Sequence, residues 1–131
     1  EHISNLSLLI AELSRVVKVG GEVEIIVPHF SNPHFYSDYT HKAFFGLYTM
    51  SYLANDLIFK RKVPDYQKSK MFNLESVNIV FKSSRPFYGR HAFKKILGFI
   101  FNLTTYLKEF YEENLCYIFP CYEIKYVLRK R

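Results

Sequence analysis

The chain has 131 residues, of which 49% are hydrophobic and 18% aromatic, so it can bury the core of one domain and is not a disordered segment. Eighteen lysines and arginines against 12 acidic residues leave a net charge of +6, too mild an excess to indicate a nucleic-acid partner. Two cysteines exclude a disulfide-dense scaffold, and the lack of a long apolar run or an opening secretory signal predicts a cytoplasmic protein.

The first predicted element is an amphipathic helix over residues 5–18, with Ser4 or Asn5 as its N-cap. Its apolar residues recur at helical spacing and form one stripe: Leu6, Leu9, Ile10, Leu13, Val16 and Val17. Gly20 and Gly21 then end the helix and turn the chain.

A strand is predicted over residues 22–27. Because the run from Ile25 to Val27 is apolar at every position, the pattern indicates a strand buried on both faces, as in a parallel sheet. Pro28 ends it. Residues 28–41 form a loop that holds three of the five histidines and lies beyond the carboxyl end of the strand, where open α/β sheets bind their ligands.

The second half of the chain continues the alternation of helix and strand. Residues 42–55 predict one or two short helices. Residues 70–82 and 121–129 are rich in β-branched and aromatic residues and predict two further strands, the first with a bulge or turn near residues 73–76. This order of elements predicts an α/β fold with flanking helices.

Residues 92–113 predict a long helix with a broad apolar side, weakened at Gly98 and at Thr104-Thr105, where it can bend. Its default role is core packing. Because two lysines stand at the start of the apolar stretch, two alternatives stay open: segment 93–107 covers a substrate cleft, or it contacts a membrane surface.

Several short motifs stand in a characteristic order: Glu1-His2-Ile3, Lys18-Val19-Gly20-Gly21, Val27-Pro28, Asp38-Tyr39-Thr40-His41 and Ile118-Phe119-Pro120. In this order and spacing the chain resembles the C-terminal half of a class I S-adenosylmethionine-dependent methyltransferase. The loop motif is similar to that of a bacterial and archaeal subgroup whose members often carry Asp-Pro-Thr-His there, and Tyr39 departs from that pattern.

The resemblance implies a fold. Strand 22–27 would be the fifth strand of a Rossmann-like sheet, and the last strand, 121–129, would insert antiparallel between it and strand 70–82. Residues 1–131 would then be a single partial domain, with one parallel strand plus an antiparallel pair and flanking helices. The family's glycine-rich turn and ribose-binding acid are not in this sequence, so we expect the chain by itself to bind S-adenosylmethionine weakly or not at all.

The implied activity is methyl transfer from S-adenosylmethionine to a small-molecule or glycan acceptor. The assigned residues are, for the cofactor, Glu1 and His2; for catalysis, His29, Asp38 and His41; and for the acceptor pocket, Phe30, Tyr36, Thr40 and Phe44. Histidine titrates near neutrality, so His41 or His29 would act as general base, with Asp38 orienting the imidazole from three residues away.

Two alternatives stay open for these residues. In the first, Asp38 or Thr40 caps a following helix and His41 only packs. In the second, the end of the chain leaves Glu1 and His2 unordered.

No metal site is expected. His29, His34, Asp38 and His41 could suggest one, but their spacing matches no standard zinc pattern. The basic residues are spread along the chain, which indicates a solvated surface and no nucleic-acid groove.

The alternative to an enzyme is a non-enzymatic basic binding or assembly module built on an α/β remnant. Strand 22–27 would lack one of its neighbours in such a remnant. Because an apolar unpaired edge invites pairing with another chain, we expect self-association through this edge.

Overall fold

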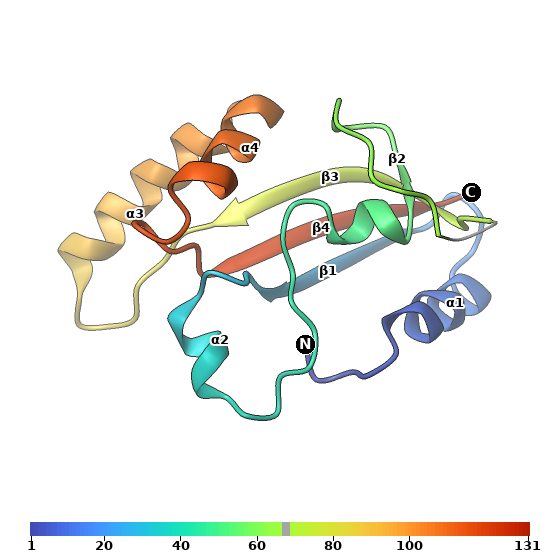
Figure 1. Cartoon of the computed structure of the whole chain (residues 1–131), viewed down its shortest axis with the longest axis horizontal. Coiled ribbons are helices and arrows are strands. Elements are labelled where there is room, and N and C mark those ends of the chain that lie inside the picture. Colours follow the sequence, from blue (N-terminus) through green and yellow to red (C-terminus); the bar gives the residue numbers. More distant parts are fainter. Residues whose placement is uncertain (67–68) are drawn as a thin grey trace.

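A four-stranded sheet with the order β1–β4–β3–β2 organises the computed structural model, which describes residues 1–66 and 69–131 (Figure 1). Its strands are β1 (Glu22–Pro28), β2 (Asn55–Asp56), β3 (Phe72–Val80) and β4 (Glu123–Lys130). The last strand, β4, lies between β1 and β3 and is antiparallel to both, so β1 and β3 run parallel to each other. The expected insertion of the final strand is therefore confirmed.

Two details of the sheet test the strand predictions. A shift in register between Leu74 and Ser76 confirms the predicted bulge. The short strand β2 pairs parallel with β3 and was not predicted, because two residues such as Asn55 and Asp56 carry no alternating pattern.

The helices differ more from the sequence prediction. They are α1 (Leu6–Val16), α2 (Pro33–Ser37), the 3₁₀ helix η1 (Thr49–Tyr52), α3 (Tyr88–Phe101) and α4 (Thr105–Asn114). The single helix predicted over 92–113 is thus two helices, and the helices predicted over 42–55 reduce to η1. In the part of the chain that the structure describes, no helix is both long and apolar enough to cross a membrane.

Local side-chain contacts explain where these helices begin. The Asn5 side chain accepts from the Leu8 N–H and caps α1, as predicted. The Thr104 side chain accepts from the Leu107 N–H, so it starts a new helix in the middle of the predicted one. Asn32 caps α2 by accepting from the His34 N–H, and Pro33 fits the first helical position, where no N–H is needed.

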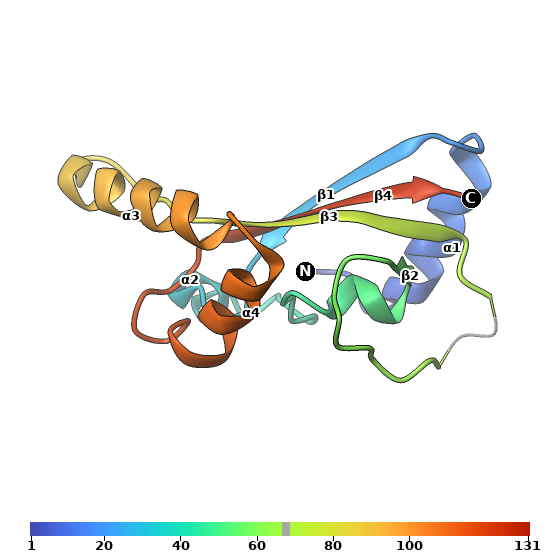
Figure 2. The same ribbon diagram turned by 90° about the horizontal axis from the view of Figure 1, so that it is seen from above.

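The hydrophobic core lies on one face of the sheet. Figure 2 shows α1, α2, η1 and α4 on the same side, and no described element covers the other side. Ile26 is 53% exposed, whereas Val27 is buried, so the prediction that β1 is buried on both faces is wrong. Its antiparallel neighbour β4 alternates between buried and partly exposed residues in the same way, which is the pattern of a sheet with one wet face.

The tight turn between α1 and β1 depends on two glycines. Gly20 has φ of +79°, a left-handed conformation that side chains rarely adopt. A Cβ on Gly21 would stand 2.8 Å from Cγ1 of Val17 and 2.9 Å from the Lys18 carbonyl oxygen. The turn joins α1 to β1, and the histidine-rich loop begins at the carboxyl end of β1.

Candidate functional site

The loop after β1 folds back against the first residue of the chain. The Glu1 carbonyl oxygen accepts hydrogen bonds from the backbone N–H groups of Lys42, over 2.7 Å, and Ala43, over 3.2 Å. These two bonds hold the segment Glu1–His2 beside the loop. The alternative that this end of the chain is unordered is therefore wrong for this structure.

His41 is fixed by contacts on three sides. Its Nδ1 lies 2.8 Å from the Phe35 carbonyl oxygen, and its ring packs on the Phe35 ring at a centroid distance of 4.6 Å. Its Nε2 lies 3.6 Å from Oδ2 of Asp38, and the side chain is 10% exposed. Because a carbonyl can only accept, Nδ1 carries the proton in the neutral ring and Nε2 carries the free electron pair.

His2 joins the same cluster through Thr40. The Thr40 hydroxyl donates to Oδ1 of Asp38 over 2.6 Å and therefore accepts from Nδ1 of His2, 2.9 Å away. The His2 and His41 rings lie 4.7 Å apart. The structure thus brings together five predicted site residues: Glu1, His2, Asp38, Thr40 and His41.

Asp38 is held as a carboxylate. The Thr40 hydroxyl and the Thr40 N–H both donate to Oδ1, and these bonds keep the Asp38 pKa below its ordinary value. Residues 42–48 form no helix, so the capping alternative for Asp38 and Thr40 is wrong. The Asp38 side chain closes a turn and faces the two imidazoles instead.

His29 lies apart from this cluster and is fully buried. The Ser31 N–H donates to Nδ1 over 3.1 Å, so Nε2 carries the proton of the neutral ring and donates to Oε2 of Glu112 over 3.1 Å. The same Glu112 oxygen accepts from the Leu47 N–H over 2.7 Å. His29 therefore links the end of β1 to α4 and leaves no ring nitrogen free.

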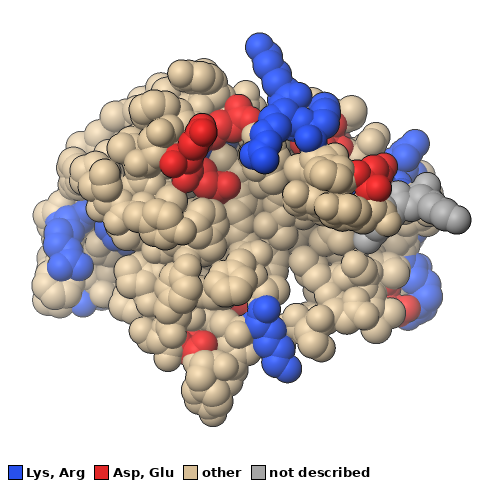
Figure 3. Space-filling model, in the orientation of Figure 1, with Lys and Arg blue, Asp and Glu red and all other residues tan. Residues whose placement is uncertain are grey.

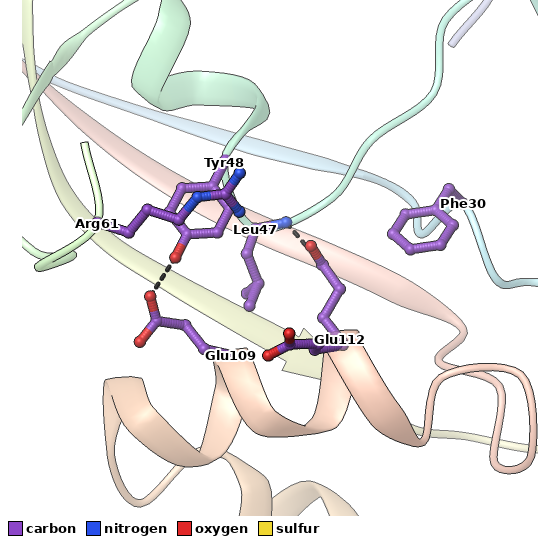
Figure 4. A pocket seen from close by; sticks show the side chains of 7 residues that line it. Phe30, Leu47, Tyr48, Arg61, Glu109 and Glu112 are labelled. Atoms are coloured by element: carbon purple, nitrogen blue, oxygen red, sulfur yellow. Dashed lines mark hydrogen bonds between the residues drawn. The ribbon is translucent and has the colours of Figure 1, made fainter. Parts of the chain in front are cut away.

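Glu112 also lines a cavity of about 520 Å³ between α4 and the segment that leads into η1 (Figure 4). Its lining residues are Phe30, Leu47, Tyr48, Arg61, Glu109, Glu112 and Glu113. The Tyr48 hydroxyl donates to Glu109, and the Arg61 guanidinium lies 5.0 Å from the centre of the Tyr48 ring. Burial, and then the bond to Glu109, raise the pKa of Tyr48 above its ordinary value.

The acidic wall of this cavity was not predicted. Glu109, Glu112 and Glu113 stand at helical spacing and so lie on one face of α4, a signal that the sequence does contain. Figure 3 shows acidic side chains gathered over α4 next to a basic group. The sequence does not show that Tyr48 and Arg61 lie opposite that face of α4.

The predicted acceptor-pocket residues fall in different places. Phe30 lines the large cavity. Tyr36 and Phe44 are each 60% exposed, and both rings pack around Phe35. A second cavity, of about 240 Å³, lies at His41 and is also lined by Glu1, His34 and Tyr122.

Comparison of the chain with protein-family models, with curated proteins and with solved structures finds no match. A function for the chain is therefore inferred from the geometry of the site and from the sequence resemblance alone.

Proposed function

We propose that this chain forms the C-terminal part of an S-adenosylmethionine-dependent methyltransferase that acts on a small-molecule or glycan acceptor. One observation carries the proposal: the last strand lies antiparallel between two parallel strands, β1 and β3. The sequence resemblance implies this arrangement of the last three strands. The cluster of polar side chains lies next to the carboxyl end of β1, where α/β sheets bind ligands.

His41 is the general base in this proposal. Its Nε2 has a free electron pair and can take the proton of an acceptor hydroxyl or amine as that atom attacks the methyl group. The Asp38 carboxylate, 3.6 Å away, stabilises the imidazolium that results. His29 has both ring nitrogens bonded and is a positioning residue that holds the end of β1 against α4.

S-adenosylmethionine supplies the methyl group, and Glu1 and His2 are its contacts from this chain. Both residues are anchored beside the loop, Glu1 by its carbonyl and His2 by Thr40. The acceptor is expected in the cavity lined by His41, with Tyr36 and Phe44 near its rim around Phe35.

The test uses the gene product isolated from its own source, whose intact mass is measured first. We expect it to bind S-adenosylmethionine and to transfer a labelled methyl group to acceptors in an extract of small molecules and glycans. His41→Ala should lower the transfer rate about 10²–10⁴-fold, the usual contribution of a general base. His91→Ala, which removes an imidazole from α3, away from this cavity, should stay near the native rate. Failure of the native protein to bind S-adenosylmethionine would overturn the proposal.

An assembly module is the second candidate function. The observation that favours it is the outer edge of β1, which pairs with no strand among residues 1–66 and 69–131. Self-association of the native protein together with no affinity for S-adenosylmethionine would select this candidate.

A further inference from the structure

We propose that Glu1, His2 and His41 bind a first-row divalent transition-metal ion, with Zn²⁺ as the test case. Each of the three residues offers one ligand atom, and these atoms all lie within 4.8 Å of one another. Two imidazoles and one carboxylate suit Zn²⁺ and its first-row neighbours, whereas Mg²⁺ and Ca²⁺ prefer oxygen ligands.

Both imidazoles are oriented as metal ligands usually are. His41 donates through Nδ1 to the Phe35 carbonyl, and His2 donates through Nδ1 to the Thr40 hydroxyl, which is itself bonded to Asp38. Each Nε2 therefore keeps its electron pair for a ligand. Outer hydrogen bonds of this kind fix the ring orientation and the tautomer at known metal sites.

The carboxylates of Asp38 and Glu1 favour a cation between the two imidazoles. Nε2 of His41 lies 3.6 Å from Oδ2 of Asp38, and Nε2 of His2 lies 3.7 Å from Oε1 of Glu1. In the neutral imidazoles, both contacts place an electron pair opposite a carboxylate, which is repulsive. A proton on each ring relieves the repulsion, and one divalent ion shared by both rings relieves it as well.

This set differs from the one that the spacing of histidines suggests. Of that group, His29 is buried against Glu112, while Asp38 remains next to the proposed ion. Glu1 and His2 join His41 across about 40 residues of chain only because the Glu1 carbonyl is bonded to the backbone after His41. No local sequence pattern contains that contact.

The experiment is equilibrium dialysis of the 131-residue chain against ZnCl₂, followed by elemental analysis. We expect one zinc ion per chain. His2→Ala and His41→Ala should each weaken binding by about 100-fold or more, since even outer-contact changes cost 10–100-fold. His34→Ala is the matched control, because it removes an imidazole from the same loop, and it should leave the affinity unchanged.

His2→Ala is the deciding variant if His41→Ala disturbs the loop, because His2 is exposed and its removal leaves the Phe35 contacts in place. Thr40→Val should weaken zinc binding about 10–100-fold through loss of the hydroxyl that orients His2. No zinc uptake by the wild type, or the same affinity in the wild type and His2→Ala, would overturn the proposal. A loss confined to His34→Ala would do so too.

The inference is independent of methyl transfer, since zinc uptake is measured without S-adenosylmethionine. The two proposals use the same three residues, Glu1, His2 and His41, and they compete most directly at one atom. Nε2 of His41 cannot hold a metal ion and accept a proton at the same time, so bound zinc should inhibit any reaction that uses His41 as its base.

Discussion

The helices α3 and α4 follow each other between β3 and β4, and both are rich in aromatic residues, but they are covered very differently. In α4, Tyr111 is fully buried and Glu112 forms hydrogen bonds with His29 and Leu47 in two other segments of the chain. In α3, Phe99 is 71% exposed and Phe93 is 50% exposed, and only Phe101 is buried. An apolar pattern therefore predicts a helix without telling which part of it meets the core.

The joint between the two helices causes the difference. The Asn102 side chain bonds to both backbone groups of Ile79, and Thr104 caps α4, so the chain turns between them. Figure 2 shows α4 on the same side of the sheet as α1 and α2, while α3 extends past the end of the sheet. Residues 76–108 also contain no acidic residue. The exposed apolar side of α3 therefore lies in a segment whose only charged side chains at neutral pH are lysines and arginines.

The largest expected effect lies on the covered side. Glu112→Ala leaves the buried N–H groups of His29 and Leu47 without an acceptor, which should lower the free energy of unfolding by about 2–4 kcal/mol. Urea denaturation measures this loss. Glu113→Ala, the exposed neighbour, should change stability by less than about 0.5 kcal/mol. Equal effects of the two changes would show that α4 is not held through Glu112.

The joint itself should contribute less. Asn102→Ala removes three hydrogen bonds, to the N–H and C=O of Ile79 and to the Gly98 carbonyl, and should cost about 1–3 kcal/mol. Asn114→Ala is the control, because its side chain makes one exposed bond. Urea midpoints that coincide for the two variants would contradict the role given to Asn102.

For the exposed side of α3, we expect substitutions to change membrane binding and to leave the stability of the fold nearly unchanged. The membrane-surface role predicted for segment 93–107 is tested with anionic vesicles at low salt. Phe99→Asp should lower binding about tenfold or more and leave the urea midpoint near the wild-type value. Leu8→Asp, an exposed apolar position on α1, should not change vesicle binding. Wild-type protein that stays free of the vesicles would remove the membrane role.

A smaller effect is expected at the outer edge of β1, where two copies of the chain would pair. Self-association through this edge predicts a sedimentation coefficient that rises with concentration, and Ile26→Lys should shift the equilibrium toward monomer because a charge on an edge strand opposes pairing. Analytical ultracentrifugation over a wide concentration range measures it. A monomer throughout that range would reject the prediction.

The smallest effect concerns Lys108 in α4, which is 9% exposed. Burial lowers its pKa below the ordinary value, so above that lowered pKa the unfolded chain binds more protons and stability rises with pH. Lys108→Met should remove the contribution of Lys108 to the rise in the free energy of unfolding between pH 7 and 10. It should not lower the free energy of unfolding at pH 7. Lys95→Met, exposed on α3, should keep the wild-type pH profile. Parallel urea titrations at the two pH values decide.

Local patterns predicted the elements with distinctive periodicity. Helix 5–18 with its Asn5 cap, the three longer strands and the bulge near residues 73–76 all follow from spacing and side-chain type. The weak point predicted at Thr104-Thr105 is where one helix ends and the next begins; only a bend was expected there, because the apolar pattern continues across it, although a threonine is a good N-cap. The exposure of Ile26 was missed because an apolar run does not reveal that one face of the sheet is left uncovered by the described helices and loops.

For the site, the sequence by itself determined which chemistry is available: imidazoles and a carboxylate in one loop, and a second imidazole and carboxylate at the start of the chain. The tertiary structure decided which of them meet. Two hydrogen bonds to the Glu1 carbonyl bring His2 to His41, and the buried bond to Glu112 takes His29 away from both. These choices depend on contacts between residues far apart in the chain, and residue spacing carries no information about such contacts.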